Sequence, residues 1–240
     1  MIKHSSNLFE IQIPCEDFFV SCFIILDEEK VIIVDSGSSS EDVDKYIKQG
    51  IENLKLTPTD LIISHQHFDH AGGKKRLLEI YSNINLHEFD NSFLSHQYKD
   101  ISHNVTLAFY PGHTKNCLAV ILKTENILLS LDCLEFFGVG RYGLDLEDIS
   151  SYFNTLKQIE KEEFSKIIAS HCFVPCGQVF NGSEEIDKAI STCYSLTMEL
   201  ISFVKNHLND SNRKIVTIFN KIKNLPPIDE QIVINIKQNM

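Results

Sequence analysis

The sequence predicts a mixed α/β (α+β) fold, and three observations support this prediction. Short apolar runs with the periodicity of strands dominate the first third of the chain. Runs of this kind then alternate with segments in which apolar residues recur every three or four positions, as they do on one face of a helix. Beyond Pro175 only the helical spacing continues, which predicts a helical C-terminal tail.

The first predicted elements are three strands and a helix. Residues 8–13 alternate between apolar and polar side chains, and residues 18–26 and 31–34 are short apolar runs on either side of a polar turn. This order is typical of a β-meander. Residues 43–54 then place apolar side chains at helical spacing behind an acidic first turn, so a helix is expected after the third strand.

The middle of the chain continues this alternation. Residues 61–64 are typical of a buried strand, and a helix carrying Leu77, Leu78 and Tyr81 follows a histidine-rich segment. A second helix is predicted from the spacing of Ile149, Phe153, Leu156 and Ile159. Further strands are predicted at residues 83–89, 105–110, 117–122, 127–131 and 167–170.

The C-terminal part of the chain is predicted to be a helical extension. A long amphipathic helix is expected to begin near Ser183, after the break at residues 175–177. A segment of this length buries little core by itself. We therefore expect a main domain at residues 1–176 and a helical extension at residues 177–240 that packs on the same domain.

Composition argues against several classes of function. The 240 residues include 22 Lys and Arg against 33 Asp and Glu, and the formal net charge of −11 disfavours nucleic acid and membrane surfaces as partners. No apolar stretch reaches the roughly 20 residues of a membrane-spanning helix, and the first residues lack the pattern of a secretory signal. Seven cysteines are an odd number in a chain too long to need disulfides. We expect a cytoplasmic protein with free thiols and a small-molecule partner.

Residues 65–70, with the sequence HQHFDH, place three imidazoles and a carboxylate between a strand and a helix. At an extended strand end, side chains two residues apart point the same way, so His65 and His67 can bind one metal ion. Asp69 and His70 follow where the chain turns, and they face a second position beside the first. A lone histidine is usually a structural residue, but this spacing favours a metal site.

This segment resembles the signature of the metallo-β-lactamase superfamily, in which a four-layer αββα sandwich holds metal ions at one edge. In that family three further ligands follow downstream, each at the end of a strand. Matching segments are Pro-Gly-His-Thr at residues 111–114, Leu-Asp-Cys at residues 131–133 and Ser-His-Cys at residues 170–172. The resemblance implies the following ligands: His65, His67 and His113 on one metal, Asp69, His70 and His171 on the second, and Asp132 between the two.

This ligand set implies two divalent metal ions, with Zn²⁺ as the first choice and iron or manganese as alternatives, because imidazole and carboxylate suit all three. Two such ions about 3.5–4 Å apart lower the pKa of a bridging water enough to form hydroxide near neutral pH. Asp69 would be the catalytic residue that orients this hydroxide and passes a proton to the leaving group. The resemblance, which extends to glyoxalase II and lactonase-like enzymes, implies a dinuclear metal-dependent hydrolase of a small ester, thioester or lactone.

Three residues outside the ligand set are also candidates. Asp35 ends a strand in a segment that resembles the family's Asp-Thr/Ser-Gly turn, which implies that it orients a ligand by hydrogen bonding. Residues 136–143 resemble the glyoxalase II segment in which a basic residue contacts the glutathione carboxylate. Arg141 stands at that position, so Arg141 and Tyr142 are expected to bind substrate. The alternative is a plain surface loop.

The chain also departs from the family pattern. Leu131 replaces the usual Gly before Asp132, and Phe173 stands where glyoxalase II has Tyr, which disfavours a glutathione thioester as substrate. Cys133 and Cys172 lie beside predicted ligands. Because the ligand set is complete without them, we interpret both as small buried hydrophobic residues rather than as ligands.

A redox function on the same fold is an alternative to hydrolysis. A persulfide-dioxygenase-like redox enzyme would hold a single iron with only His65, His113 and Asp132. Metal content and oxygen consumption separate this enzyme from a dinuclear hydrolase, because the dioxygenase has one iron and consumes oxygen.

Overall fold

The protein divides into two compact units that each combine separated segments of the chain. Unit 1 comprises Met1–Phe109 and Leu118–Thr124, and unit 2 comprises Tyr110–Cys117 and Glu125–Met240. The computed structural model describes residues 1–136, 138–139, 143–222 and 225–238.

Unit 1 is built on a six-stranded sheet whose strands lie in chain order. The first four strands are antiparallel, the fifth pairs in parallel with the fourth, and the sixth pairs in parallel with the fifth. Parallel strands end at the same edge of a sheet, so the residues that follow the fourth and fifth strands are brought together. The strands are β1 (Ile2–Lys3), β2 (Leu8–Cys15), β3 (Phe18–Asp27), β4 (Lys30–Val34), β5 (Asp60–Ile62) and β6 (Asn85–His87).

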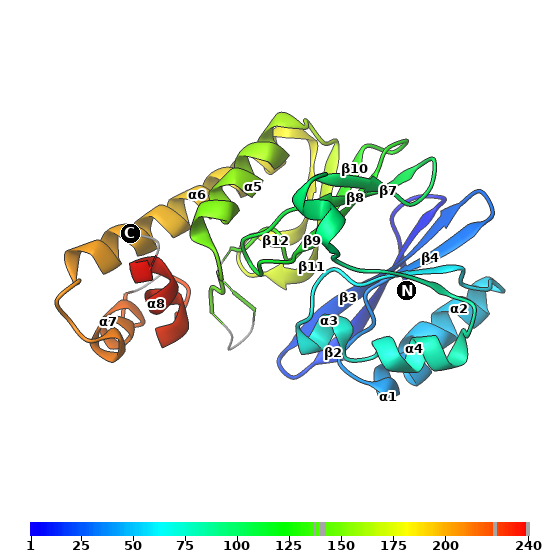
Figure 1. The fold of residues 1–240 in the computed structure, drawn as a ribbon, viewed down its shortest axis with the longest axis horizontal. Coiled ribbons are helices and arrows are strands. Elements are labelled where there is room, and N and C mark those ends of the chain that lie inside the picture. Colours follow the sequence, from blue (N-terminus) through cyan, green and yellow to red (C-terminus); the bar gives the residue numbers. More distant parts are fainter. Residues whose placement is uncertain (137, 140–142, 223–224, 239–240) are drawn as a thin grey trace. The chain divides into compact units, whose positions relative to one another are not determined.

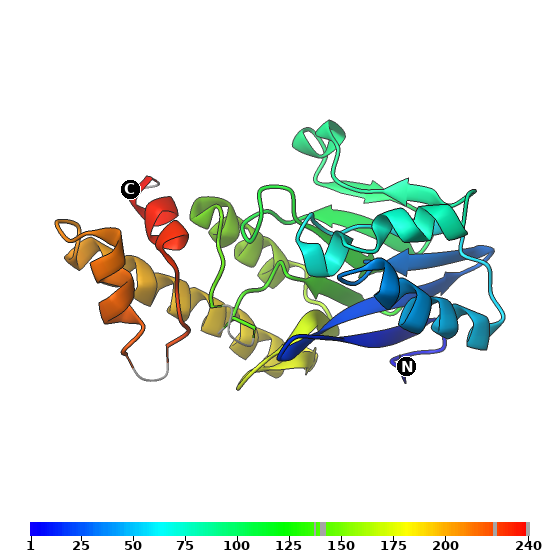
Figure 2. The same cartoon turned by 90° about the horizontal axis from the view of Figure 1, so that it is seen from below.

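Helices cover one face of this sheet, as Figures 1 and 2 show. Ser39 caps the first helical segment, because its hydroxyl accepts a hydrogen bond from the Asp42 backbone. The predicted helix over residues 43–54 is confirmed, as is the helix around Leu77. The helical elements of unit 1 are α1 (Ser40–Asp42), η1 (Val43–Ile47), α2 (Lys48–Leu54), α3 (Phe68–Ala71), α4 (Lys74–Ile80) and η2 (Asn91–Leu94).

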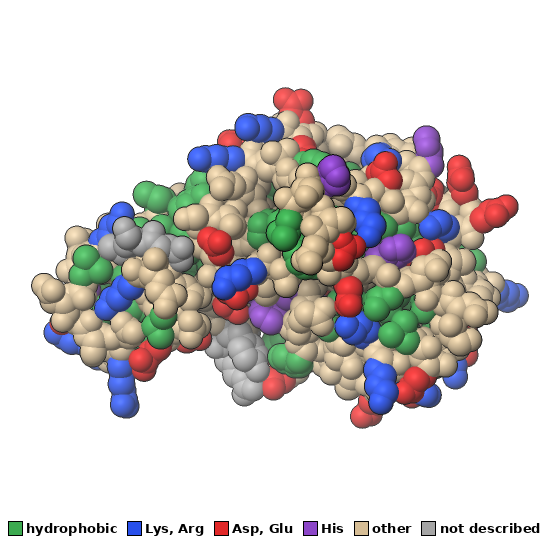
Figure 3. Space-filling model, in the orientation of Figure 1, with side chains coloured by type: hydrophobic (Ala, Val, Ile, Leu, Met, Phe, Trp, Pro, Cys, Tyr) green, Lys and Arg blue, Asp and Glu red, His purple; other side chains and the backbone are tan. Residues whose placement is uncertain are grey.

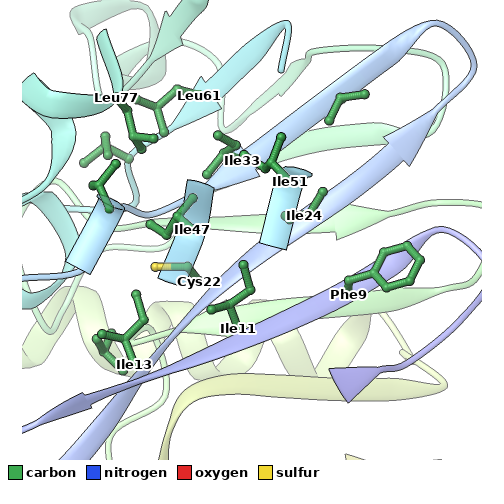
Figure 4. Packing of buried hydrophobic residues seen from close by; sticks show 14 residues of the cluster. Phe9, Ile11, Ile13, Cys22, Ile24, Ile33, Ile47, Ile51, Leu61 and Leu77 are labelled. Carbon is green, nitrogen blue, oxygen red and sulfur yellow. The ribbon is translucent and has the colours of Figure 1, made fainter. Parts of the chain in front are cut away.

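The core of unit 1 lies between these helices and the sheet (Figure 4). Ile24 and Ile33 point from the strands toward Ile47 and Ile51 of the helical segment, and all four side chains are buried. Full burial of one such side chain contributes roughly 1.5–3 kcal/mol relative to its exposure. The close packing of this layer gives the strand ends a rigid support.

A second group of strands in unit 1 forms an antiparallel ladder: β7 (Tyr98–Asp100), β8 (Val105–Phe109) and β9 (Leu118–Leu122). Strands β8 and β9 confirm two predicted strands, and nearly all of their residues are buried, as continuous apolar runs suggest. Strand β7 is exposed along its length, and no pattern in the sequence predicted it.

Unit 2 contains the strands β10 (Ile127–Leu131), β11 (Lys166–Phe173) and β12 (Gly177–Asn181). Strand β11 pairs in parallel with β10 and antiparallel with β12. Helix α5 (Ile149–Lys161) begins at Asp148, whose carboxylate accepts a hydrogen bond from the Ser151 backbone. Tyr152 is fully buried in this helix, whereas Phe153, which the apolar spacing placed on the buried face, is half-buried.

The helical tail of unit 2 consists of α6 (Gly182–Asn206), α7 (Asn212–Phe219) and α8 (Glu230–Gln238), which confirms the long helix predicted near Ser183. Helix α8 packs against α6 and α7. It is also tied to the segment before α5, because Asn235 Nδ2 donates to the Leu146 carbonyl at 3.0 Å. The division into compact units does not test the boundary at residue 176, which stays a prediction.

Charged side chains of both signs are interspersed on the face shown in Figure 3.

Within the described residues, no helix has the length and apolar character needed to cross a membrane.

Candidate metal centre

In unit 1, the four predicted ligands of residues 65–70 lie between the end of β5 and the helix α3, which includes the last two of them. The backbone of His67 is extended, and its carbonyl accepts hydrogen bonds from the His70 and Ala71 backbones, which starts the short helix. The ring centroids of His65 and His67 are 4.6 Å apart, and those of His65 and His70 are 4.2 Å apart. The strand end and the helical turn thus gather three imidazoles. His65, Asp69 and His70 are buried, and His67 is half-buried.

Asp35 follows β4 and contacts one of these ligands directly. Its Oδ2 atom lies 2.7 Å from His70 Nδ1, and its two oxygens also accept hydrogen bonds from the backbone and hydroxyl of Ser64 at 2.8 and 2.9 Å. Asp35 is fully buried, and its backbone is left-handed with φ +62°. On the other side of the ring, His70 Nε2 lies 3.7 Å from Asp69 Oδ2. The two nitrogens of His70 therefore face two different carboxylates.

Ser64, which the sequence analysis did not identify, orients His65. Its hydroxyl proton is donated to Asp35, so the same oxygen accepts the hydrogen bond from His65 Nδ1 at 2.9 Å. This assignment leaves Nε2 as the nitrogen that can bind a metal ion. Ser36 adds a further restraint, because its backbone and hydroxyl both donate to the His70 carbonyl.

In unit 2, His113 lies in a loop that packs closely on α5. A Cβ atom added at Gly112 would lie 2.6 Å from Tyr152 Cα, so only glycine permits this approach. His113 Nδ1 lies 2.9 Å from Glu135 Oε1 and 3.0 Å from the Asp145 carbonyl. His113 Nε2 lies 3.7 Å from Asp132 Oδ2. As with His70 in unit 1, the two nitrogens of one imidazole face different oxygen groups.

Asp132 follows β10, and His171 lies near the end of β11, which pairs in parallel with β10, so the two side chains meet at the same edge. The pairing of these strands shifts between Leu129 and Leu131, and Leu131 is left-handed with φ +52°. Glycine adopts this conformation without strain, which accounts for the Gly that the family usually has there. His171 Nε2 lies 3.4 Å from Asp132 Oδ2, and both side chains are buried.

Burial and neighbouring charges shift the pKa values of His113 and Glu135. Burial acts to lower the pKa of His113, but the charge of Glu135, its hydrogen bond and the charge of Asp132 outweigh burial and hold the pKa well above its ordinary value. Burial raises the pKa of Glu135 to about 7, although His113 opposes the shift. Glu135 and His113 therefore form a tightly coupled acid–base pair.

The structure thus gathers the seven predicted ligands in two sets, with four in unit 1 and three in unit 2. Arg141 and Tyr142, the predicted substrate contacts, lie outside the described residues. Cys133 is buried as expected, and its sulfur lies 3.3 Å from that of Cys117. The prediction that Cys172 is buried is wrong, because alternation along β11 turns this side chain outward while His171 points inward.

Comparison with known proteins supports the resemblance that the motifs predict. Residues 15–88 match the family model described as the metallo-beta-lactamase superfamily. A metallo-beta-lactamase from Erythrobacter litoralis superimposes with a TM-score of 0.65 at 12% identity and covers 81% of this chain and 95% of its own. The mono-zinc form of FIM-1 from Pseudomonas aeruginosa has a TM-score of 0.63 at 16% identity, with coverage of 81% and 94%. The predicted mixed α/β fold is confirmed.

Curated relatives match at low identity. A hydroxyacylglutathione hydrolase from Francisella tularensis subsp. holarctica is 24% identical over 152 residues, which are 58% of this chain and 57% of the relative. One from Francisella philomiragia is 25% identical over 150 residues, with coverage of 57% and 56%. The match therefore spans little more than half the length of these relatives. Together with the family model and the fold, it confirms the predicted resemblance to the metallo-β-lactamase superfamily.

Proposed function

We propose that the protein is a dinuclear metal-dependent hydrolase of a small ester, thioester or lactone. One observation carries this proposal: each unit holds a buried imidazole whose Nδ1 contacts a carboxylate and whose Nε2 faces a second carboxylate. Histidines that bind metals typically have this arrangement, in which one nitrogen is held by an outer partner and the other binds the ion.

The chemistry of the donor set fits divalent cations. Neutral imidazoles and carboxylates suit zinc, iron and manganese, and zinc is the first candidate. When bound, two such ions would activate water and polarise a carbonyl group. In this proposal the residues that hold them are His65, His67 and His113 for one ion, Asp69, His70 and His171 for the other, and Asp132 for both.

The chain's own residues would position and protonate the reactants. Asp35 and Ser64 hold the imidazoles of His70 and His65 in the orientation that directs Nε2 toward an ion. Asp69 is buried beside His70, where its carboxylate can orient the attacking water, accept a proton and transfer it to the leaving group. Arg141 and Tyr142 remain proposed substrate contacts.

The relatives named as hydroxyacylglutathione hydrolases place acyl compounds first among the candidate substrates. All seven cysteines are free thiols. Free thiols are typical of a reducing compartment, which supports the cytoplasmic location predicted from the sequence. That location stays a prediction.

Metal analysis combined with a substrate panel tests the proposal. The purified full chain would be loaded with zinc, its metal content measured by elemental analysis, and hydrolysis followed on generic esters, thioesters, lactones and a chromogenic cephalosporin. We expect two ions per chain and turnover of at least one acyl substrate. One iron per chain with oxygen consumption would instead support the persulfide-dioxygenase-like alternative, and a chain that binds no metal would refute both.

A further inference from the structure

Glu135 is a buried carboxylate that belongs to none of the predicted ligand segments. Its Oε1 atom lies 2.9 Å from His113 Nδ1, on the opposite side of the ring from Asp132. We propose that Glu135 is a positioning residue of the metal centre, which accepts the Nδ1 hydrogen of His113 and thereby presents Nε2 as the metal ligand. This inference rests on the proposed function, because it assumes that His113 binds a metal ion.

The neighbours of His113 determine which nitrogen carries the hydrogen. Nδ1 lies within 3.0 Å of both Glu135 Oε1 and the Asp145 carbonyl. A carbonyl oxygen can only accept a hydrogen bond, so Nδ1 must carry a hydrogen whatever the protonation state of the carboxyl group. The lone pair of the neutral imidazole then lies on Nε2, which faces Asp132.

Glu135 is itself held in place by Tyr152 of α5. The Tyr152 hydroxyl accepts a hydrogen bond from the Glu135 backbone at 2.8 Å and donates one to the Glu135 carbonyl at 2.9 Å. The same tyrosine packs against Gly112, the residue before His113. One buried side chain therefore supports both partners of the Glu135–His113 pair, which restricts their relative movement.

The segment that precedes α5 completes the support of His113. The Glu147 backbone donates to the carbonyls of Gly112 and His113 at 2.9 and 3.0 Å. Asp145, whose carbonyl contacts His113 Nδ1, is two residues earlier. The backbone of this segment thus limits rotation of the imidazole, and Glu135 adds negative charge that makes Nε2 a stronger donor to a cation.

Zinc affinity of variants tests this role without measuring catalysis. Wild type, Glu135→Gln, Glu135→Ala and the control Glu162→Gln would be compared by competition with a chromophoric chelator. Glu162 is a suitable control because it is a partly buried carboxylate of unit 2 that accepts a hydrogen bond from the Tyr110 hydroxyl. We expect affinity to fall about 10-fold in Glu135→Gln and up to about 100-fold in Glu135→Ala, with less than about twofold change in the control.

The outcomes separate this inference from the proposed function. If wild type binds two zinc ions and Glu135→Ala binds them as tightly, Glu135 has no positioning role, whereas the metal centre stands. If wild type binds no zinc, the proposed function itself fails. An equal loss of affinity in Glu162→Gln would also overturn the inference, because the effect would then not be specific to the carboxylate that contacts His113.

A second measurement needs no variant at position 135, so it remains informative if Glu135→Ala does not fold. Long-range ¹H–¹⁵N spectra of the zinc-loaded, histidine-labelled wild type would report the state of each ring nitrogen, with His113 assigned from the spectrum of His113→Asn. We expect a protonated Nδ1 and a metal-bound Nε2. Zinc bound through Nδ1 would refute the proposed role.

Discussion

The two units build similar carboxylate–imidazole pairs from different parts of the chain. In unit 1, Asp35 holds His70, and four predicted ligands come from the six residues 65–70. In unit 2, Glu135 holds His113, and the ligands are spread from His113 to residue 171. A compact motif at one strand end can therefore be recognised from sequence, whereas a ligand set from three separate segments is recognised only once the fold brings them together.

The two carboxylates also differ in how they are stabilised. Asp35 accepts a hydrogen bond from a backbone N–H and one from a hydroxyl of Ser64, in addition to its contact with His70. At Glu135, burial raises the pKa to about 7 despite the opposing effect of His113. Loss of Asp35 is therefore expected to reduce stability by leaving its donors unsatisfied, whereas loss of Glu135 is expected to reduce zinc affinity.

The largest effect is expected from removal of the carboxylate that faces two imidazoles. Asp132→Ala should abolish hydrolysis and reduce bound metal below two ions per chain, because Oδ2 lies close to Nε2 of both His113 and His171. Elemental analysis and the substrate panel would measure both effects. Asp187→Ala, on the exposed face of α6, is the control. Full activity in Asp132→Ala would falsify the ligand assignment.

Asp35→Ala should lower the free energy of unfolding by about 1–3 kcal/mol, because it removes the buried acceptor of His70 and of both Ser64 donors and leaves these groups unsatisfied. Urea denaturation of the metal-free protein measures this loss. Asp35→Asn retains an acceptor oxygen and should lose less. A loss in Asp35→Ala no larger than in Asp35→Asn would show that these hydrogen bonds contribute little.

Asp60 lies at the start of β5, at the opposite end of the strand from the predicted ligands, and its carboxylate is expected to affect stability rather than metal binding. Burial acts to raise its pKa, but hydrogen bonds from His87 and Thr59 and the charge of Lys30 outweigh burial and hold the pKa below its ordinary 3.8. A lowered pKa stabilises the folded state above the ordinary pKa, and this stabilisation is lost as pH falls through the folded-state value.

Asp60→Asn should therefore be less stable than wild type at pH 7, and the difference should shrink as the pH falls below the ordinary pKa of 3.8. Urea denaturation at several pH values measures it, with Asp17→Asn, at an exposed position, as the control. A difference that stays constant with pH would contradict the assignment to carboxylate charge.

The smallest effect is expected at the contact between the helical tail and the segment that supports His113. Asn235→Ala removes the hydrogen bond to the Leu146 carbonyl and should cost about 1 kcal/mol in the free energy of unfolding. Gln231→Ala, an exposed neighbour that donates to Asn235, should cost less than about 0.5 kcal/mol. Equal losses in both variants would show that the buried bond to Leu146 has no special importance.

Much of the fold was predictable because apolar periodicity is a local property. The strand predicted at residues 18–26 and the helix predicted at residues 43–54 both occur close to their expected bounds. Strand β12 was not predicted, because its five residues follow a turn and contain no apolar run. The outward position of Cys172 followed from alternation along β11 and was predictable in principle.

The candidate site was predictable only in part. Residue types and their order along the chain identified the seven predicted ligands, since each follows a strand or lies in the HQHFDH segment. Ser64 lies next to a ligand, but serine is common and carries no distinctive pattern. Glu135 had no motif at all, and its role depends on Tyr152 and His113, which lie elsewhere in the chain.

The residues of the chain alone predict which side chains are candidate ligands, which strand ends carry them and which superfamily the chain resembles. The folded chain adds which carboxylate contacts which imidazole: Asp35 contacts a histidine 35 residues away, and Glu135 contacts the histidine of a preceding loop. The physical reason is that the orientation of an imidazole depends on the acceptor at its Nδ1. That acceptor is supplied by chain folding and not by neighbours in the sequence.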